Sequence, residues 1–196
     1  MKLATRLSFA VLLGLLAGCY STGRQFARPN LDAFELRKTT AGEVIASFGQ
    51  PKSVASTTRN DKKIERFQYQ YFTAQGYATG SGPIGRTASY FFSDGVMVGY
   101  LYTSNYPGDS TDFDEAKARS IIQGKSTRRE MESLLGKPVG MAVYPLIDFR
   151  EDTELRYSYI GNTGLMGSGT IIKNAIFRVS DGGMVTDAKV SIEEKK

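Results

Sequence analysis

The sequence contains two similar halves, and this internal repeat limits the folds open to the chain more than any other feature. Residues 38–51 (KTTAGEVIASFGQP) align with residues 125–138 (KSTRREMESLLGKP) at an offset of 87 residues. Further on, residues 91–98 align with residues 178–185 at the same offset, and both segments contain Ser-Asp-Gly. Matches that share one offset indicate a duplicated structural unit.

Each copy predicts a short helix that is capped at both ends. The segments 40–43 and 127–130 both read T-x-x-E. In such a capping box the threonine oxygen accepts from the third backbone N–H, and the glutamate accepts from the threonine's own N–H. Gly49 and Gly136, each followed two residues later by proline, fit a left-handed residue that ends a helix.

Alternating apolar residues predict strands after each capped helix. Asp-Gly between two such runs is a strong hairpin signal. The expected strands cover about residues 52–57, 64–72, 87–92, 96–103, 139–144, 154–160, 170–179 and 184–192, and further short helices cover about 31–37 and 114–123. Helices followed by strands predict an α+β fold, with two tandem helix-helix-antiparallel-sheet repeats and the helices packed on one sheet face.

The N-terminus has the layout of an export signal. Lys2 and Arg6 precede an uncharged stretch over residues 7–16, which is too short for a transmembrane helix of roughly 20 residues. The segment Leu-Ala-Gly-Cys at 16–19 contains the only cysteine and resembles the lipobox of bacterial lipoproteins. The resemblance implies cleavage before Cys19, lipid attachment to it, and, with tyrosine next in the chain, an outer-membrane location facing the periplasm. A buried structural cysteine is the alternative.

The expected organisation follows from the anchor and the repeats. It comprises a signal peptide (1–18), a lipidated N-terminus and tether (19–29), a first repeat (30–104), a linker (105–112), a second repeat (113–192) and a tail (193–196). Removing Lys2 and Arg6 with the signal peptide lowers the net charge from +5 to +3. The remaining basic residues are scattered, so no nucleic-acid partner is expected.

The composition argues against common kinds of catalysis. The chain has no histidine, which excludes serine–histidine and cysteine–histidine nucleophiles and removes the commonest metal ligand. Residues 80–87 imitate a phosphate-binding loop, but Arg86 replaces the lysine and a strand pattern follows where a helix is required. The acidic segment 109–115 lacks the spacing of a calcium loop. We therefore expect no metal, no cofactor and no enzymatic activity, with a carboxylate-based hydrolase as a remaining alternative.

The paired helix, the Gly-x-Pro ending and the Ser-Asp-Gly hairpin resemble two families. One is the group of small outer-membrane lipoproteins of the SmpA/OmlA/BamE type, which have one copy of the unit. The other is the β-lactamase-inhibitor-protein fold, which has two tandem copies. The first resemblance implies a protein-binding or scaffolding module in envelope assembly or maintenance. The second implies a module that binds and blocks a periplasmic or surface enzyme.

Tyrosines are the candidate protein-binding residues. By period-two alternation they share one side of their strands. They are Tyr69, Tyr71, Tyr100, Tyr102, Tyr157 and Tyr159. Tyrosine suits interfaces because it buries area while its hydroxyl stays hydrated. If these rings face the helices instead, they belong to the core.

Overall fold

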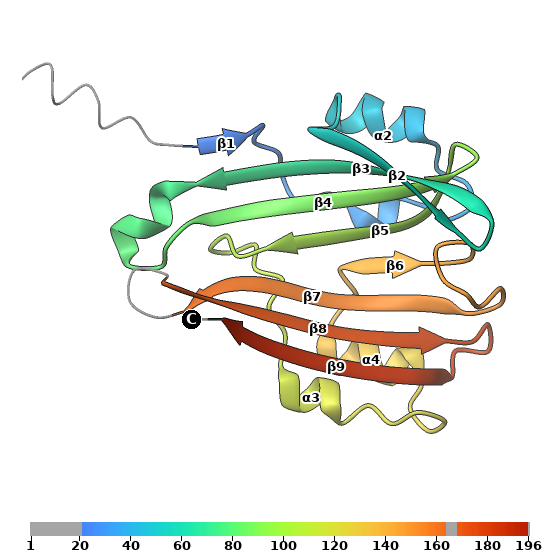
Figure 1. Ribbon diagram of the computed structural model, residues 1–196. Coiled ribbons are helices and arrows are strands. Elements are labelled where there is room, and N and C mark those ends of the chain that lie inside the picture. Colours follow the sequence, from blue (N-terminus) through green and yellow to red (C-terminus); the bar gives the residue numbers. More distant parts are fainter. Residues whose placement is uncertain (1–20, 164–167, 196) are drawn as a thin grey trace, which may run out of the picture.

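The chain forms one antiparallel sheet with short helices on one of its faces (Figure 1). The computed structural model describes residues 21–163 and 168–195, so the predicted signal peptide and Cys19 lie outside the described residues. The elements are β1 (Ser21–Gly23), η1 (Leu31–Ala33), α2 (Ala41–Phe48), β2 (Ser53–Arg59), β3 (Lys62–Thr73), η2 (Ala74–Thr79), β4 (Ile84–Ser93), β5 (Val96–Ser104), α3 (Glu115–Arg119), α4 (Arg128–Leu135), β6 (Gly140–Ala142), β7 (Thr153–Thr163), β8 (Gly169–Val179) and β9 (Val185–Lys195).

The strands of both halves belong to one sheet. Within the described residues nine strands lie in the order β1-β3-β4-β5-β6-β7-β8-β9, with β2 paired to β3 as well. β1 and β2 occupy different parts of β3, since β1 pairs with residues 71–73 and β2 with residues 62–68. The short strand β6 pairs with β5 on one side and β7 on the other, and so joins the halves.

The predicted fold class of two helix-helix-sheet repeats is wrong. The structure is mostly antiparallel sheet, and its few helices are short. The helix expected over residues 31–37 is only the single turn η1, because the following backbone pairs with β5: the Arg37 N–H donates to the Met97 carbonyl at 2.8 Å. The helix expected over residues 114–123 is limited to α3.

Both capped helices form as their sequences predict at the N-terminus. The Thr40 N–H donates to the Glu43 carboxylate at 2.7 Å, and the Thr127 N–H to that of Glu130 at 2.8 Å. At the other end the stop residue Gly49 has φ 76° and ψ −167°, so its φ is positive but it is not in the left-handed helical region. Glycine alone adopts this backbone conformation readily.

The two larger core clusters lie between the sheet and the helices. One row of paired residues crosses the sheet on the helix side: Phe67, Tyr90, Tyr100, Met141, Leu155, Phe177 and Ala188. Val44 of α2 packs on the first half of this row, and Met131 of α4 packs on the second half. Both side chains are fully buried, and Met141 contacts both clusters.

Candidate binding surface on the open sheet face

The structure places most of the predicted tyrosines in the core. Tyr69, Tyr100, Tyr102 and Tyr157 are at most 6% exposed and face the helices. The Tyr69 hydroxyl donates to the Gly49 carbonyl at 2.9 Å, and the Tyr157 hydroxyl donates to the Gly136 carbonyl at 2.7 Å. Burial raises the pKa of Tyr157, so this hydroxyl stays protonated as a donor. These two tyrosines therefore hold the ends of α2 and α4 on the sheet.

Tyr71 and Tyr159 lie on the helix side of the sheet, like the other four tyrosines, but they are only half-buried. Tyr71 stacks on Tyr106 with 6.3 Å between ring centroids. The Lys173 ammonium lies 5.8 Å from the centre of the Tyr159 ring. A role of the six tyrosines in partner binding stays a prediction, and the burial of four of them speaks against it.

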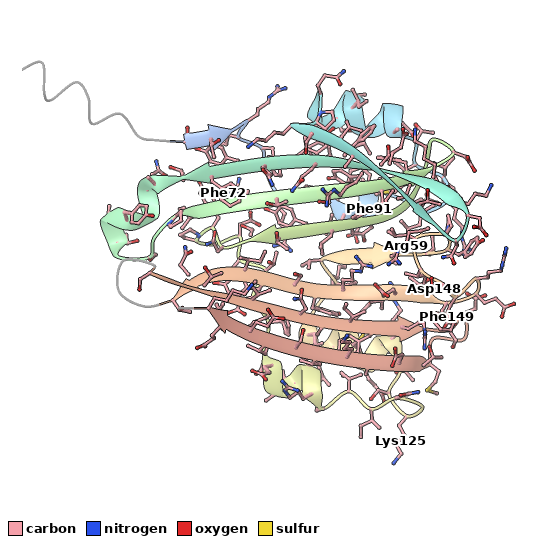
Figure 2. All side chains as sticks on the ribbon, viewed as in Figure 1. Arg59, Phe72, Phe91, Lys125, Asp148 and Phe149 are labelled. Atoms are coloured by element: carbon pink, nitrogen blue, oxygen red, sulfur yellow. The ribbon has the colours of Figure 1, made fainter. Side chains whose placement is uncertain are left out.

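The opposite face of the sheet, which we call the open face, lies toward the viewer in Figure 2. Because side chains alternate along a strand, the row next to the core row points to this face. Its members are Gln68, Ser89, Leu101, Gly140, Arg156, Ile176 and Lys189. α2, α3 and α4 pack against the other side of the sheet. No described helix covers the open face, but part of it is buried, because Ile64, Val98 and Val143 form a separate cluster there with Phe91 and Leu146.

An apolar hollow lies at one end of the open face. Phe72 and Ile160 are 37% and 49% exposed and line a cavity of about 110 Å³. The Phe72 ring lies over Gly85 on the neighbouring strand, where any side chain would collide with it. The Asn162 side chain donates to the Ser81 carbonyl at 2.9 Å, which ties β7 to the loop before β4.

A charged and aromatic patch lies at the other end of the open face. The Arg178 guanidinium lies 3.5 Å from the centre of the Phe149 ring. This ring is 48% exposed and is labelled in Figure 2. The Arg178 Nε lies 3.1 Å from the Asp152 carboxylate. The loop that carries Phe149 is held in place by Asn60, whose side-chain amide donates to the Ile147 carbonyl at 3.1 Å. The patch therefore combines a fixed arginine with an exposed ring.

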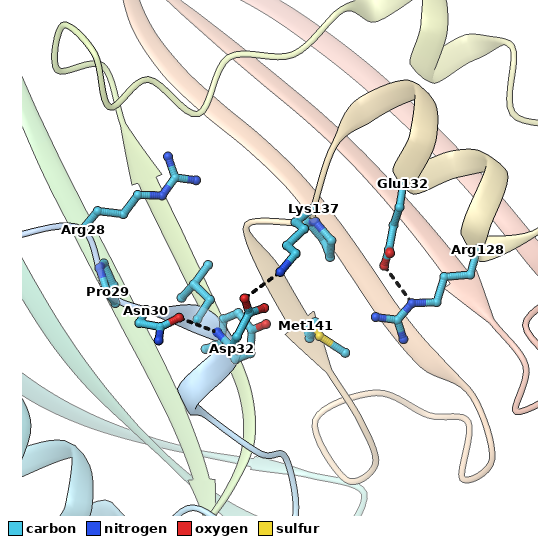
Figure 3. A pocket seen from close by; sticks show the side chains of 11 residues that line it. Arg28, Pro29, Asn30, Asp32, Arg128, Glu132, Lys137 and Met141 are labelled. Carbon is cyan, nitrogen blue, oxygen red and sulfur yellow. Dashed lines mark hydrogen bonds and ion pairs between the residues drawn. The ribbon is translucent and has the colours of Figure 1, made fainter.

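Another hollow, of about 270 Å³, lies on the helix side, between the two halves (Figure 3). Lys137 pairs with Asp32 at 2.6 Å, and Arg128 pairs with Glu132 at 2.8 Å. Burial, followed by the Asp32 carboxylate, raises the pKa of Tyr100 to about 12. Each charge that lines this hollow has an opposite partner, since Arg28 pairs with Asp109 at 3.3 Å, and the tyrosine hydroxyl stays protonated. We assign no chemistry to it.

The described residues hold no group of three or more histidine, cysteine, aspartate or glutamate side chains that would bind a metal ion. Hydrogen bonds from Thr127 lower the pKa of Glu130, and the same contacts from Thr40 lower that of Glu43. Both carboxylates thus serve helix capping. No helix in the described part of the chain is long and apolar enough to cross a membrane.

Sequence reasoning missed the exposed residues of the open face. For Phe72 and Ile160 the sequence contained a signal. Alternation places each of them on the other face of its strand from the tyrosine that precedes it. Exposed apolar side chains that adjoin one another, unlike single scattered ones, mark a candidate binding surface. For Phe149 and Arg178 there was no local signal, since a loop and a strand 29 positions apart bring them together.

Comparison with known proteins gives little further information. No protein-family model and no curated protein matches the chain. Among solved structures, the chain is similar to a protein from Streptococcus mutans described as a candidate beta-lactamase inhibitor protein. The match covers 78% of this chain and 82% of that one, at 10% sequence identity and a TM-score of 0.42. At this TM-score the likeness carries no argument about what this chain binds.

Proposed function

We propose that this chain is a lipid-anchored, non-catalytic protein-binding module of the bacterial envelope, which binds a protein partner through its open face. One observation carries the proposal: the helices cover one sheet face, while the other exposes Phe72 and Ile160 at one end and Phe149 beside Arg178 at the other. Aromatic side chains and arginine are enriched in protein interfaces. The open face therefore replaces the tyrosines as the candidate surface.

The anchor is part of the same proposal. The apolar leader and the segment at 16–19 support lipidation of Cys19 and a place on the periplasmic side of the outer membrane. One acyl chain gives only marginal membrane binding, so several chains are needed for lasting attachment. The histidine-free sequence supports a role without acid–base catalysis.

The proposal is tested by site-specific photo-crosslinking in cells, followed by mass spectrometry of the captured proteins. We expect a crosslinker at Ile160 or Phe149 to capture a protein partner. A crosslinker at Leu134, which is 42% exposed on α4, should not capture it. Capture from Leu134 alone would place the partner on the helix side and refute the proposal.

A matched pair of variants tests the energetics. Ile160 and Ile122 are 49% and 52% exposed, but only Ile160 lies on the open face. Full burial of an isoleucine contributes about 1.5–3 kcal/mol, which corresponds to roughly 10- to 100-fold in affinity. Ile160→Ser should therefore weaken the captured complex by up to this factor, and Ile122→Ser should leave it unchanged.

The identity of the partner separates the two predicted roles. Recovery of outer-membrane barrel proteins or their assembly machinery would support scaffolding in envelope assembly or maintenance. Recovery of one soluble enzyme in equal amount would favour the alternative, an inhibitor-like module that blocks a periplasmic or surface enzyme.

A further inference from the structure

The chain enters the fold at one end of the sheet, and it is bound there from its first described residue. β1 pairs with the end of β3, with Ser21 opposite Thr73. A single residue separates Ser21 from Cys19, so covalent geometry keeps the two Cα atoms within about 7 Å of each other. Further contacts fix the next residues, since Arg86 donates to the Phe26 carbonyl at 2.7 Å. The segment predicted as a tether is therefore packed on the sheet from Ser21 onward.

The same end of the sheet is poor in charge. The stretch 67–85, which contains the connection between β3 and β4, has no aspartate, glutamate, lysine or arginine, and neither have the described residues 157–163 and 168–172. Thr73 pairs with Ile84 where the first connection leaves the sheet. We call residues 73–84 the uncharged end. Its Tyr77 is 47% exposed.

The turns at the opposite end carry charges. The turn between β2 and β3 contains Asp61, flanked by Arg59 and Lys62, and Asp94 and Asp181 lie in the turns that follow β4 and β8. At the uncharged end, the strand terminus that carries charges is the end of β9, where residues 193–195 pair with the start of β8. β9 is the edge strand farthest from β1 in the sheet. The turns at the opposite end are therefore charged, whereas residues 73–84 are not, and the charges nearest to them in the sheet order lie on the far edge strand.

We propose that the uncharged end rests on the surface of the membrane that holds the lipid of Cys19, so that the sheet stands on this end. The inference depends on the lipid anchor of the proposed function. The short connection brings this end to the bilayer, and charged groups resist the desolvation that such contact requires. Tyrosine is enriched at membrane–water interfaces, which fits the exposure of Tyr77.

The orientation has a consequence for the open face. Ten residues of β3 separate Thr73 from Lys63, which corresponds to about 33 Å along the strand. The patch of Phe149 and Arg178 would therefore lie far from the bilayer, while the hollow around Phe72 would lie close to it. A partner in the membrane would meet the hollow first, and a soluble partner would meet the patch.

Fluorescence quenching tests the orientation with the lipidated full chain, purified from bacterial membranes and placed in phospholipid vesicles. Because the natural sequence has one cysteine, Gln75→Cys and Lys63→Cys each add a thiol that can be labelled selectively once lipid occupies Cys19. Both positions are exposed. With nitroxide groups on the lipid headgroups, we expect the probe at Gln75 to lose more than half of its emission and the probe at Lys63 to lose little. Equal quenching at the two positions would overturn the proposal.

Two controls keep the possible failures apart. The mass of the purified protein shows whether Cys19 carries lipid, and a protein without lipid would contradict the proposed anchor before orientation is measured. A chain with twelve Gly/Ser residues inserted before Ser21 keeps the lipidation site, and such a linker spans about 19 Å. Quenching at Gln75 should then fall toward the value at Lys63, because the connection no longer holds this end at the bilayer.

Discussion

Replacement of Asp109 with alanine should destabilise the fold by about 3–5 kcal/mol, because it breaks a buried ion pair by removing one partner. The Asp109 side chain is 12% exposed and lies 2.9 Å from the Arg86 Nε. It also accepts a hydrogen bond from the Tyr102 hydroxyl at 2.6 Å, and Arg28 approaches it at 3.3 Å. The carboxylate therefore joins the N-terminal segment, β4, β5 and the connection between the halves.

The size of this destabilisation follows from the unpaired arginine that Asp109→Ala leaves buried. The Arg86 side chain is 15% exposed, and its buried Nε makes no hydrogen bond, so Asp109 at 2.9 Å compensates it through charge alone. Without the carboxylate, the arginine is a buried charge that has lost its counterion. The pair of Asp32 and Lys137 is a suitable comparison, because both side chains are at least 67% exposed. Asp32→Ala should cost about 0–1 kcal/mol, as exposed ion pairs do.

Urea unfolding at neutral pH measures the difference between the two variants, with Cys19→Ser as the background to remove the proposed lipidation site. The midpoint of Asp109→Ala should fall well below that of Asp32→Ala. Adding Arg86→Met to Asp109→Ala should recover part of the loss, because the uncompensated charge is then gone. The reasoning is refuted if Asp109→Ala and Asp32→Ala unfold at the same urea concentration.

Three further predictions concern the second capped helix. Thr127→Ala should cost about 1 kcal/mol and lower the melting temperature by about 2–4 °C, because it removes the cap of α4; an unchanged melting temperature would show that the cap contributes nothing. Hydrogen bonds from Thr127 lower the pKa of Glu130 below its unfolded value of 4.5. The contribution of this carboxylate to stability is therefore present above pH 4.5 and is lost as the pH falls through the lower pKa of the folded state. Calorimetry in acid should consequently show a smaller effect of Thr127→Ala. Met131→Ala should cost about 2–5 kcal/mol because this side chain is fully buried, whereas Leu134→Ala, at a position 42% exposed, should cost far less in the same denaturation assay.

Much of the local structure could be predicted from the sequence. The capping boxes, the glycine helix stops with positive φ, the Asp94-Gly95 turn and the strand segments lie close to their predicted positions. These features depend on residues only a few positions apart. A threonine and a glutamate three residues later can form their hydrogen bonds whatever surrounds them.

Long-range pairing decided the fold class. Residues 31–37 contain enough apolar side chains for a helix, yet they form only η1 before Arg37 pairs with β5. Similarly, residues 105–112 read as a polar linker, but Asp109 reaches into a buried network with Arg86. In both segments a partner far away in the chain supplies the contacts that decide the conformation, and no local pattern contains that partner.

The sequence by itself determined which residues share a face of the sheet, because side-chain alternation is a property of the strand. It placed Tyr69 with Tyr71, and it placed Phe72 on the opposite side. Only the tertiary structure decided which of these faces the helices cover. The physical reason is that alternation fixes relative directions within a strand, whereas burial depends on where α2 and α4 pack. That packing buried most of the tyrosines and left Phe72 and Ile160 exposed on the open face.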